Sequence, residues 1–153
     1  MHKYTFWLMI LFSLSFMFSG CGQPTELQNK VKVCFGNGYD DKDYRVAKNT
    51  KVETGYASYY AKCMQGRRTA SGETCDLCKY TAAHRTLPFG TMLRVTMLQN
   101  NKSVIVKVND RGPRVRGRVI DLSLAAAKQL DLIRPGVAKV KIERLEKVKT
   151  EKK

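Results

Sequence analysis

Hydrophobic and polar residues alternate with a period of two over much of residues 54–145. That alternation is typical of strands with one buried face, and the segments that carry it are rich in β-branched and aromatic side chains. A polar turn at residues 99–102 separates two of these segments and predicts a hairpin. The predicted strands are 56–60, 92–98, 103–108, 119–122 and 137–145.

A short helix interrupts this pattern. Ser123, a preferred N-cap residue, precedes an alanine-rich run over residues 124–130. An Arg-Pro-Gly sequence at 134–136 then breaks the chain before the last strand. Several short strands with one helix predict a mainly β domain over residues 54–145, folded as a compact closed barrel.

The segments on either side of this domain are polar. Residues 21–53 are charged and show little periodicity, which predicts a flexible tether. Residues 146–153 form a charged tail whose end we expect to fray. The sequence has no solenoid-type repeat, and we expect no second domain.

The first residues predict export. A basic start, an apolar run at residues 6–18 and a small-residue cleavage site describe a signal peptide over residues 1–20. The apolar run is shorter than a transmembrane helix requires.

Residues 18–21 also resemble a bacterial lipobox, with Phe18 where that motif usually has an aliphatic residue. Cys21 would then carry palmitate and anchor the chain to a membrane, and an ordinary signal peptide is the alternative. Gly22, rather than an aspartate, follows Cys21 and gives no signal for retention at an inner membrane. We therefore expect a lipid anchor at the periplasmic face of the outer membrane of a Gram-negative bacterium.

The formal net charge is +15 at pH 7. Such a basic chain often binds nucleic acid, but export argues against that partner. An exported basic protein is expected to meet an anionic wall polymer or a membrane surface. We therefore predict no nucleic-acid partner, and the sequence does not set the oligomeric state.

Four cysteines remain beyond Cys21, an even number. In a small exported domain this predicts two disulfides, with three possible connectivities. A zinc site is one alternative, and a redox role for the CxxC motif is another, although no βαβ pattern surrounds it. Export favours disulfides, so we predict no metal and no cofactor; the candidates are Cys34, Cys63, Cys75 and Cys78.

Two short blocks carry candidate chemistry. The block 108–113 ends an apolar strand with Asp110, Arg111 and a Gly-Pro turn. A carboxylate at a strand end can be held rigidly as a catalytic group, whereas the alternative is a turn aspartate bonded to its own backbone. The block 82–91 holds His84, the only histidine besides His2.

These blocks belong to a longer pattern that resembles the rare lipoprotein A (RlpA) domain. The matching blocks, in the family's order, are 55–60, 66–73, 81–91, 108–113 and 117–123. The resemblance implies a six-stranded double-psi β-barrel, as in expansins and barwin-like proteins. It also implies lytic transglycosylase activity on the glycan strands of peptidoglycan, with a preference for strands without stem peptides. The cysteines are not part of this pattern.

Many members of that family add a C-terminal SPOR domain, which binds strands without stem peptides. This chain ends too early to hold one, so the sequence gives no basis for septal targeting by that route.

The resemblance also implies roles for individual residues. Asp110 matches the family's functional aspartate, and we expect it to act as acid and then base. One carboxyl group can do both because the C6 hydroxyl of muramic acid replaces water and leaves a 1,6-anhydro end, provided that the group carries a proton at the working pH.

His84 matches the family's histidine, and we expect it to hydrogen-bond Asp110 or the N-acetyl group of a sugar. A structural histidine bonded to a loop is the alternative. Glu73 matches the family's glutamate as a second carboxylate or a substrate contact. The remaining predicted substrate contacts are Tyr59, Tyr60, Thr69, Arg111 and Asp121.

Two other classes of function fit the same sequence. One is a non-catalytic, expansin-like module that binds peptidoglycan. The other is a structural lipoprotein of the cell envelope that bridges membrane and wall through its basic surface.

Overall fold

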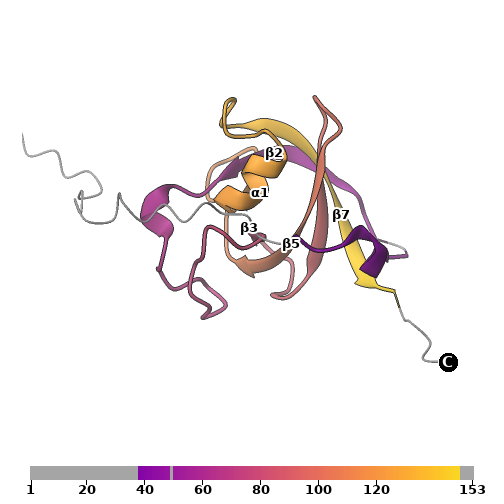
Figure 1. Cartoon of the computed structure of the whole chain (residues 1–153), viewed down its shortest axis with the longest axis horizontal. Helices are drawn as coiled ribbons and strands as arrows, with labels where there is room; N and C mark the ends of the chain where they lie inside the picture. Colours follow the sequence, from indigo (N-terminus) through magenta and orange to yellow (C-terminus); the bar gives the residue numbers. More distant parts are fainter. Residues whose placement is uncertain (1–37, 49, 149–153) are drawn as a thin grey trace, which may run out of the picture. The chain divides into compact units, whose positions relative to one another are not determined.

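The computed structural model describes residues 38–48 and 50–148 (Figure 1). The predicted signal peptide, the predicted lipidation site Cys21 and the disulfide candidate Cys34 lie outside the described residues. None of the helices in the described ranges is long and apolar enough to cross a membrane.

Within these ranges the chain is mainly β. The strands are β1 (Tyr44–Val46), β2 (Glu53–Tyr59), β3 (Thr81–His84), β4 (Met92–Met97), β5 (Ser103–Asp110), β6 (Arg118–Leu122) and β7 (Ala138–Lys147). The helical segments are α1 (Leu124–Gln129) and the 3-10 turns η2 (Asp41–Asp43) and η3 (Lys62–Met64).

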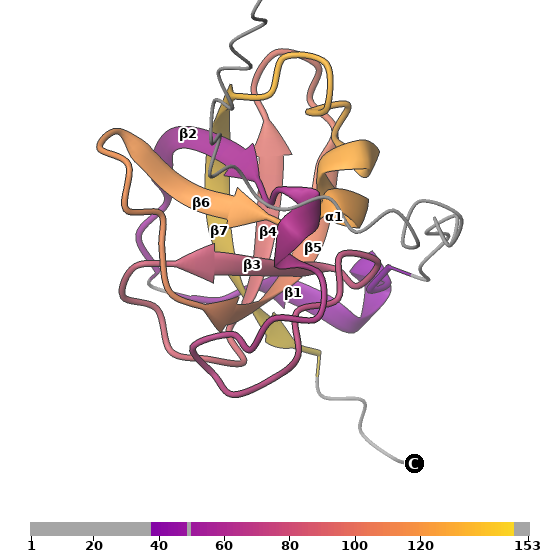
Figure 2. The ribbon, with the colours of Figure 1, turned by 90° about the vertical axis from the view of Figure 1, so that its left-hand side faces the viewer.

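Six of the described strands close into a barrel in the order β7-β2-β6-β3-β5-β4, because β4 also pairs with β7. The pairs β2–β6 and β3–β5 are parallel, and the other pairs are antiparallel. Figure 2 shows β2, β6 and β3 side by side in one wall of this barrel. The prediction of a closed six-stranded barrel is confirmed.

Alternate residues of the strands fill the barrel with aliphatic side chains. Leu93, Val95, Val106, Ile120 and Leu122 are fully buried there, and each contributes about 1.5–3 kcal/mol through removal of its side chain from water. Helix α1 adds its alanines to this core. The predicted N-cap is present, since the Ser123 side chain accepts a hydrogen bond from the Ala126 N–H at 3.3 Å.

Strand β3 is absent from the elements that the sequence pattern predicts. All four of its residues are buried, because β3 has β5 on one side and β6 on the other and Tyr60, Cys75 and Leu77 pack against its Ala83. A strand buried on both faces shows no alternation of hydrophobic and polar residues, so nothing in the pattern marks it.

Parts of the segments predicted as tether and tail form a strand pair. Residues 44–46 form β1 and pair with residues 145–147 at the end of β7. The Arg45 Nε lies 2.7 Å from a Glu146 carboxylate oxygen across this pair. A strand of three residues is too short to show a hydrophobic period in the sequence. β1 forms because β7 continues past the barrel and offers an unpaired edge.

Candidate functional site

Two aspartates lie in one row across the barrel wall. Ala83 of β3 pairs with Asp110 of β5 on one side and with Asp121 of β6 on the other. Ser58 of β2 continues the row beyond Asp121. Residues paired side by side in a sheet point to the same face, so the two carboxylates flank Ala83 on a common face.

A β-bulge sets the direction of Asp110. Val108 pairs with Ala82, yet Asp110 pairs with Ala83, so Asn109 is an extra residue in β5. Val108 faces the core, and regular alternation would have turned Asp110 to the same side. The bulge instead aims Asp110 outward, which is a known use of bulges near functional sites.

Three hydrogen bonds hold the Asp110 carboxylate. Its Oδ1 accepts from the backbone N–H of Ala70 at 2.9 Å and of Arg111 at 2.8 Å. Its Oδ2 accepts from the Tyr60 hydroxyl at 3.2 Å. Burial and the nearby Asp110 raise the pKa of Tyr60, so this hydroxyl stays protonated and donates.

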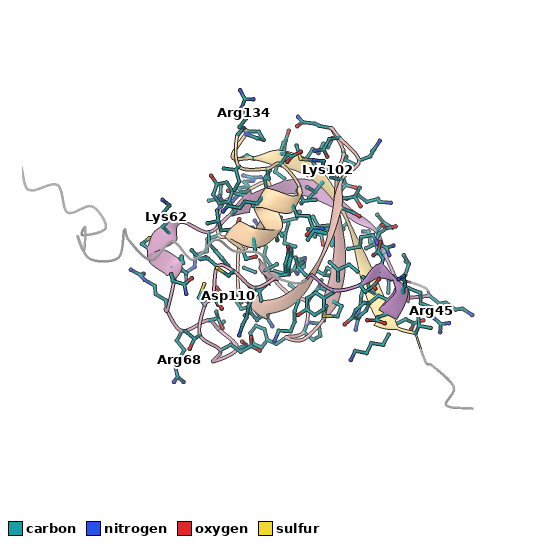
Figure 3. The ribbon with its side chains drawn as sticks, in the orientation of Figure 1. Arg45, Lys62, Arg68, Lys102, Asp110 and Arg134 are labelled. Atoms are coloured by element: carbon teal, nitrogen blue, oxygen red, sulfur yellow. The ribbon has the colours of Figure 1, made fainter. Side chains whose placement is uncertain are left out.

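The loop that carries Ala70 covers one side of Asp110. It is fastened internally by the Thr69 N–H and hydroxyl, both bonded to the Glu73 carbonyl at 2.8 and 2.9 Å. The Ser71 N–H donates to the Asn109 carbonyl at 3.2 Å and ties the loop to β5. In Figure 3, Arg68 of this loop projects away from the barrel, while Asp110 lies between the loop and the strands.

Glu73 lies on the same loop but does not hydrogen-bond Asp110. One carboxylate oxygen of Glu73 accepts from the Lys107 ammonium at 2.7 Å, and the other accepts from the Asn109 side-chain amide at 3.0 Å. These two hydrogen bonds lower the pKa of Glu73 below its ordinary value. Glu73 is therefore held as a carboxylate beside the bulge.

Asp121 is paired with a cation. The Arg118 Nε lies 3.3 Å from one Asp121 carboxylate oxygen, and the side chain of Asp121 is only 15% exposed. Burial raises the pKa of Asp121, Arg118 opposes that shift, and the charge of Asp110 adds to it. The charge of Asp110 thus contributes to the raised pKa of Asp121, although Ala83 lies between the two residues.

His84 does not contact Asp110, so the predicted hydrogen bond between them is wrong. Ala83 faces the Asp110 side, and the next residue of a strand points to the opposite face. The His84 Nε2 lies 3.1 Å from a Glu53 carboxylate oxygen. Both residues line a cavity of about 510 Å³ that does not include Asp110.

His84 instead supports the loop that follows it. Its Nδ1 accepts from the backbone N–H groups of Thr86 and Leu87 at 3.3 and 3.2 Å. We infer from these donors that Nδ1 carries no proton and that the Nε2–H donates to Glu53. The predicted alternative of a structural histidine describes this geometry.

The loop after His84 in turn holds the chain beyond Asp110. The Arg85 side chain donates to the carbonyls of Pro113 and Val115, both at 2.8 Å. The Arg111 guanidinium lies over the Phe89 ring at 3.7 Å from its centroid, a favourable cation–π contact. This contact holds the Arg111 side chain against Phe89.

Of the other predicted substrate contacts, Tyr60 and Thr69 belong to the surroundings of Asp110. Tyr59 does not, because it packs against the barrel core and its hydroxyl donates to the Ile133 carbonyl at 3.5 Å. Adjacent residues of the strand end again point to opposite faces.

The cysteines depart from the predicted two disulfides. Cys63 and Cys75 are free thiols, and Cys78 is disulfide-bonded. Cys63 is exposed while Cys75 is buried with Tyr60, Leu77 and Ala83, so their thiols are in different environments. Within the described ranges no group of three or more His, Cys, Asp or Glu side chains could hold a metal ion.

The family described as lytic transglycolase matches residues 52–142. A probable endolytic peptidoglycan transglycosylase RlpA of Treponema pallidum is 58% identical over 93 residues, which are 61% of this chain and 29% of that protein. The endolytic peptidoglycan transglycosylase RlpA of Vibrio cholerae is 48% identical over 104 residues, 67% of this chain and 40% of that protein. The one from Pseudomonas aeruginosa is 55% identical over 94 residues, 61% of this chain and 28% of that protein.

The matched part is thus less than half the length of each of these relatives. Among solved structures, the Streptomyces papain inhibitor matches with a TM-score of 0.50 and 25% identity, over 62% of this chain and 94% of that one. The match over residues 52–142 and the closed barrel show that this chain belongs to the lytic transglycolase family and has the double-psi β-barrel that its RlpA resemblance predicts.

Proposed function

We propose that this protein is a lytic transglycosylase that cleaves the glycan strands of peptidoglycan and leaves 1,6-anhydromuramoyl ends. The observation that carries the proposal is the pair of carboxyl groups, Asp110 and Asp121, on either side of Ala83 in one barrel wall. Carboxyl groups supply the proton transfer and the charge stabilisation that glycosidic cleavage needs. Several matched relatives are themselves named endolytic peptidoglycan transglycosylases.

Asp110 is the proposed acid and base. It protonates the glycosidic oxygen as the bond to C1 of muramic acid breaks. The C6 hydroxyl of the same sugar then attacks C1 and returns its proton to Asp110, so the group ends as it began and no water is consumed. The hydrogen bonds from Ala70, Arg111 and Tyr60 support this role because they hold the carboxyl group in one orientation.

Asp121 is the proposed second carboxyl group. Burial raises the pKa of Asp121, Arg118 opposes that shift, and the nearby charge of Asp110 adds to it. Arg118 holds Asp121 in place at the other side of Ala83.

The substrate and location follow from the same proposal. We expect a preference for strands without stem peptides and an action in the cell envelope. The lipobox-like residues 18–21 support a lipid anchor on Cys21, at the periplasmic face of the outer membrane. Glu73 acts as a substrate contact on the loop beside Asp110, where Lys107 and Asn109 hold it.

Product analysis tests this function. The full chain is incubated with sacculi whose stem peptides an amidase has removed, and the soluble products are examined by mass spectrometry. The wild-type protein should release glycan fragments with 1,6-anhydro ends, and Asp110→Asn should lower that release by at least about a hundredfold. Asp131→Asn is a matched control, since Asp131 is exposed and pairs with Lys102 away from the site.

Other outcomes point to the other functions. Retained binding to sacculi without anhydro ends would favour a non-catalytic, expansin-like module. Neither cleavage nor binding would favour a structural envelope lipoprotein.

A further inference from the structure

A second cavity, of about 360 Å³, lies beside Glu73. Its lining combines two tyrosines, two lysines and a carboxylate: Tyr39, Tyr80, Lys79, Lys107 and Glu73, with Thr81 and Cys78. Tyr39 lies outside the residues matched by the family, which begin at 52. Part of the cavity lining therefore comes from a residue that precedes the segment matched by the family.

This cavity follows the same two strands as the proposed catalytic row. Thr81 pairs with Lys107 in β3 and β5, just as Ala83 pairs with Asp110. Lys107 and Asp110 are separated along β5 by about 10 Å, from the rise of a strand. Glu73 bridges the interval through Lys107 and Asn109. The cavity therefore begins about 10 Å from Asp110 along β5.

The charges in the cavity favour an anion. Lys107 is paired with Glu73, so its charge is largely compensated. Lys79 is exposed and takes part in none of the ion pairs found within the described ranges. Lys79 still lies close enough to help lower the pKa of Glu73. The cavity thus has one ammonium group available for an acidic ligand.

The tyrosines favour a ring beside that anion. Tyr39 is held by an edge-to-face contact with Tyr44, with ring centroids 6.0 Å apart. Tyr39 lines the cavity together with Lys107 and Glu73. An aromatic ring at the wall offers a flat apolar surface and a hydroxyl at its edge, which suits a pyranose.

We propose that this cavity is a binding subsite for an acidic sugar of the glycan strand, with Lys79 binding its carboxylate and Tyr39 contacting its ring. On a bare strand of peptidoglycan the carboxylate is the free lactyl group of muramic acid, and a stem peptide converts that group into an amide. Lys79 then distinguishes the free acid from the amide, because only the acid carries a charge. This inference rests on the proposed function.

Binding measurements on two forms of one glycan test the subsite. Peptide-free glycan oligomers of defined length are prepared with free lactyl carboxylates or with the same carboxylates converted to methylamides. Affinities are measured by titration calorimetry with the full chain carrying Asp110→Asn, which prevents turnover. Lys79→Gln should weaken binding of the free acid by about tenfold and leave binding of the amide unchanged.

Two further variants sharpen the result. Tyr39→Ala should weaken both forms by the same factor, since it removes a ring contact and no charge. Lys139→Gln is the matched control, because Lys139 is an exposed lysine on β7, and it should change neither affinity. Equal losses for acid and amide in Lys79→Gln, or no loss at all, would overturn the subsite while leaving the proposed function standing. Failure of the Asp110→Asn protein to bind either oligomer would overturn both.

Discussion

The His84 Nε2 lies 3.1 Å from the Glu53 Oε2, and this contact joins the end of β3 to the start of β2. The other ring nitrogen accepts two backbone N–H groups of the following loop. Both nitrogens of the only described histidine are thus engaged away from Asp110. We propose that His84 is a positioning residue, which acts on the site through the loop that holds Arg111 and Pro113.

Replacement of His84 should therefore lower the free energy of unfolding without removing a proton-transfer group. We expect His84→Ala to lose about 1–3 kcal/mol of unfolding free energy, because it removes the acceptor of the two backbone N–H groups of Thr86 and Leu87. Activity should fall as the loop near Asp110 loses its support. Urea denaturation measures the first effect, and the pH profile of kcat distinguishes the second from a lost proton-transfer group.

The profile is the decisive readout. If His84 only positions the loop, His84→Gln should keep the wild-type pH dependence at a reduced kcat. Disappearance of one limb of the profile would show that His84 transfers a proton. Glu53→Gln is the matched control, since its amide oxygen can still accept from Nε2, and it should cost less than about 1 kcal/mol.

A second prediction concerns the pH dependence of stability. The pKa of Asp121 is raised in the folded state, so the folded protein holds this proton more tightly than the unfolded chain does. The resulting stability is complete below the unfolded pKa and is lost as the pH rises through the folded pKa. Asp121→Asn cannot ionise, so its stability relative to wild type should increase between about pH 4 and pH 7. Urea unfolding at both pH values checks this, and a constant difference would contradict it.

The sequence predicts the elements that have a regular pattern. Residues 92–98 and 103–108 alternate cleanly and form the β4–β5 hairpin, because one face of each is buried and the other is not. The helix is marked by Ser123 and its alanines. By contrast β3 is buried on both faces, so it has no period to detect.

The sequence singles out Asp110, His84 and Asp121 as candidate site residues, but it does not predict which of them lie in contact. Asp110 is identifiable at a strand end, yet its outward direction depends on the bulge at Asn109, which arises only when β5 pairs with β3. The same undetected strand explains the error on His84 and the unforeseen row with Asp121. Long-range pairing brings these residues together, and no local pattern encodes it.

A third prediction concerns the pair Glu73–Lys107. Hydrogen bonds from Lys107 and Asn109 lower the pKa of Glu73, so the stability that this carboxylate contributes is present above its unfolded pKa and is lost as the pH falls through the folded value. Lys107→Gln removes the largest cause. The Glu73 pKa, followed by NMR of its side-chain carboxyl carbon, should therefore rise toward the ordinary value of a glutamate. An unchanged titration would show that Lys107 does not hold the loop in solution.

A fourth prediction tests the packing between Gly55 of β2 and Val119 of β6. Val119 is the extra residue of a second register shift, since Tyr56 pairs with Arg118 while Ala57 pairs with Ile120. A Cβ at position 55 would lie 2.9 Å from the Val119 Cγ2 and closer still to its Cγ1, nearer than side chains normally approach. Gly55→Ala should therefore destabilise the fold by about 1–3 kcal/mol, as overpacking does.

The clash should be relieved by a smaller partner. Val119→Ala removes the two methyl groups that a Cβ at position 55 would meet, so the double variant should be more stable than the sum of the two single changes implies, by about 0.5–3 kcal/mol. Gly38→Ala is the control, because a Cβ there meets its nearest atom at 3.7 Å, an ordinary contact. Urea unfolding of the four variants measures the cycle. Strict additivity would mean that the β2–β6 wall yields at this point, and the Ser58–Asp121–Ala83–Asp110 row would then lack the rigid wall that the proposed catalytic pair requires.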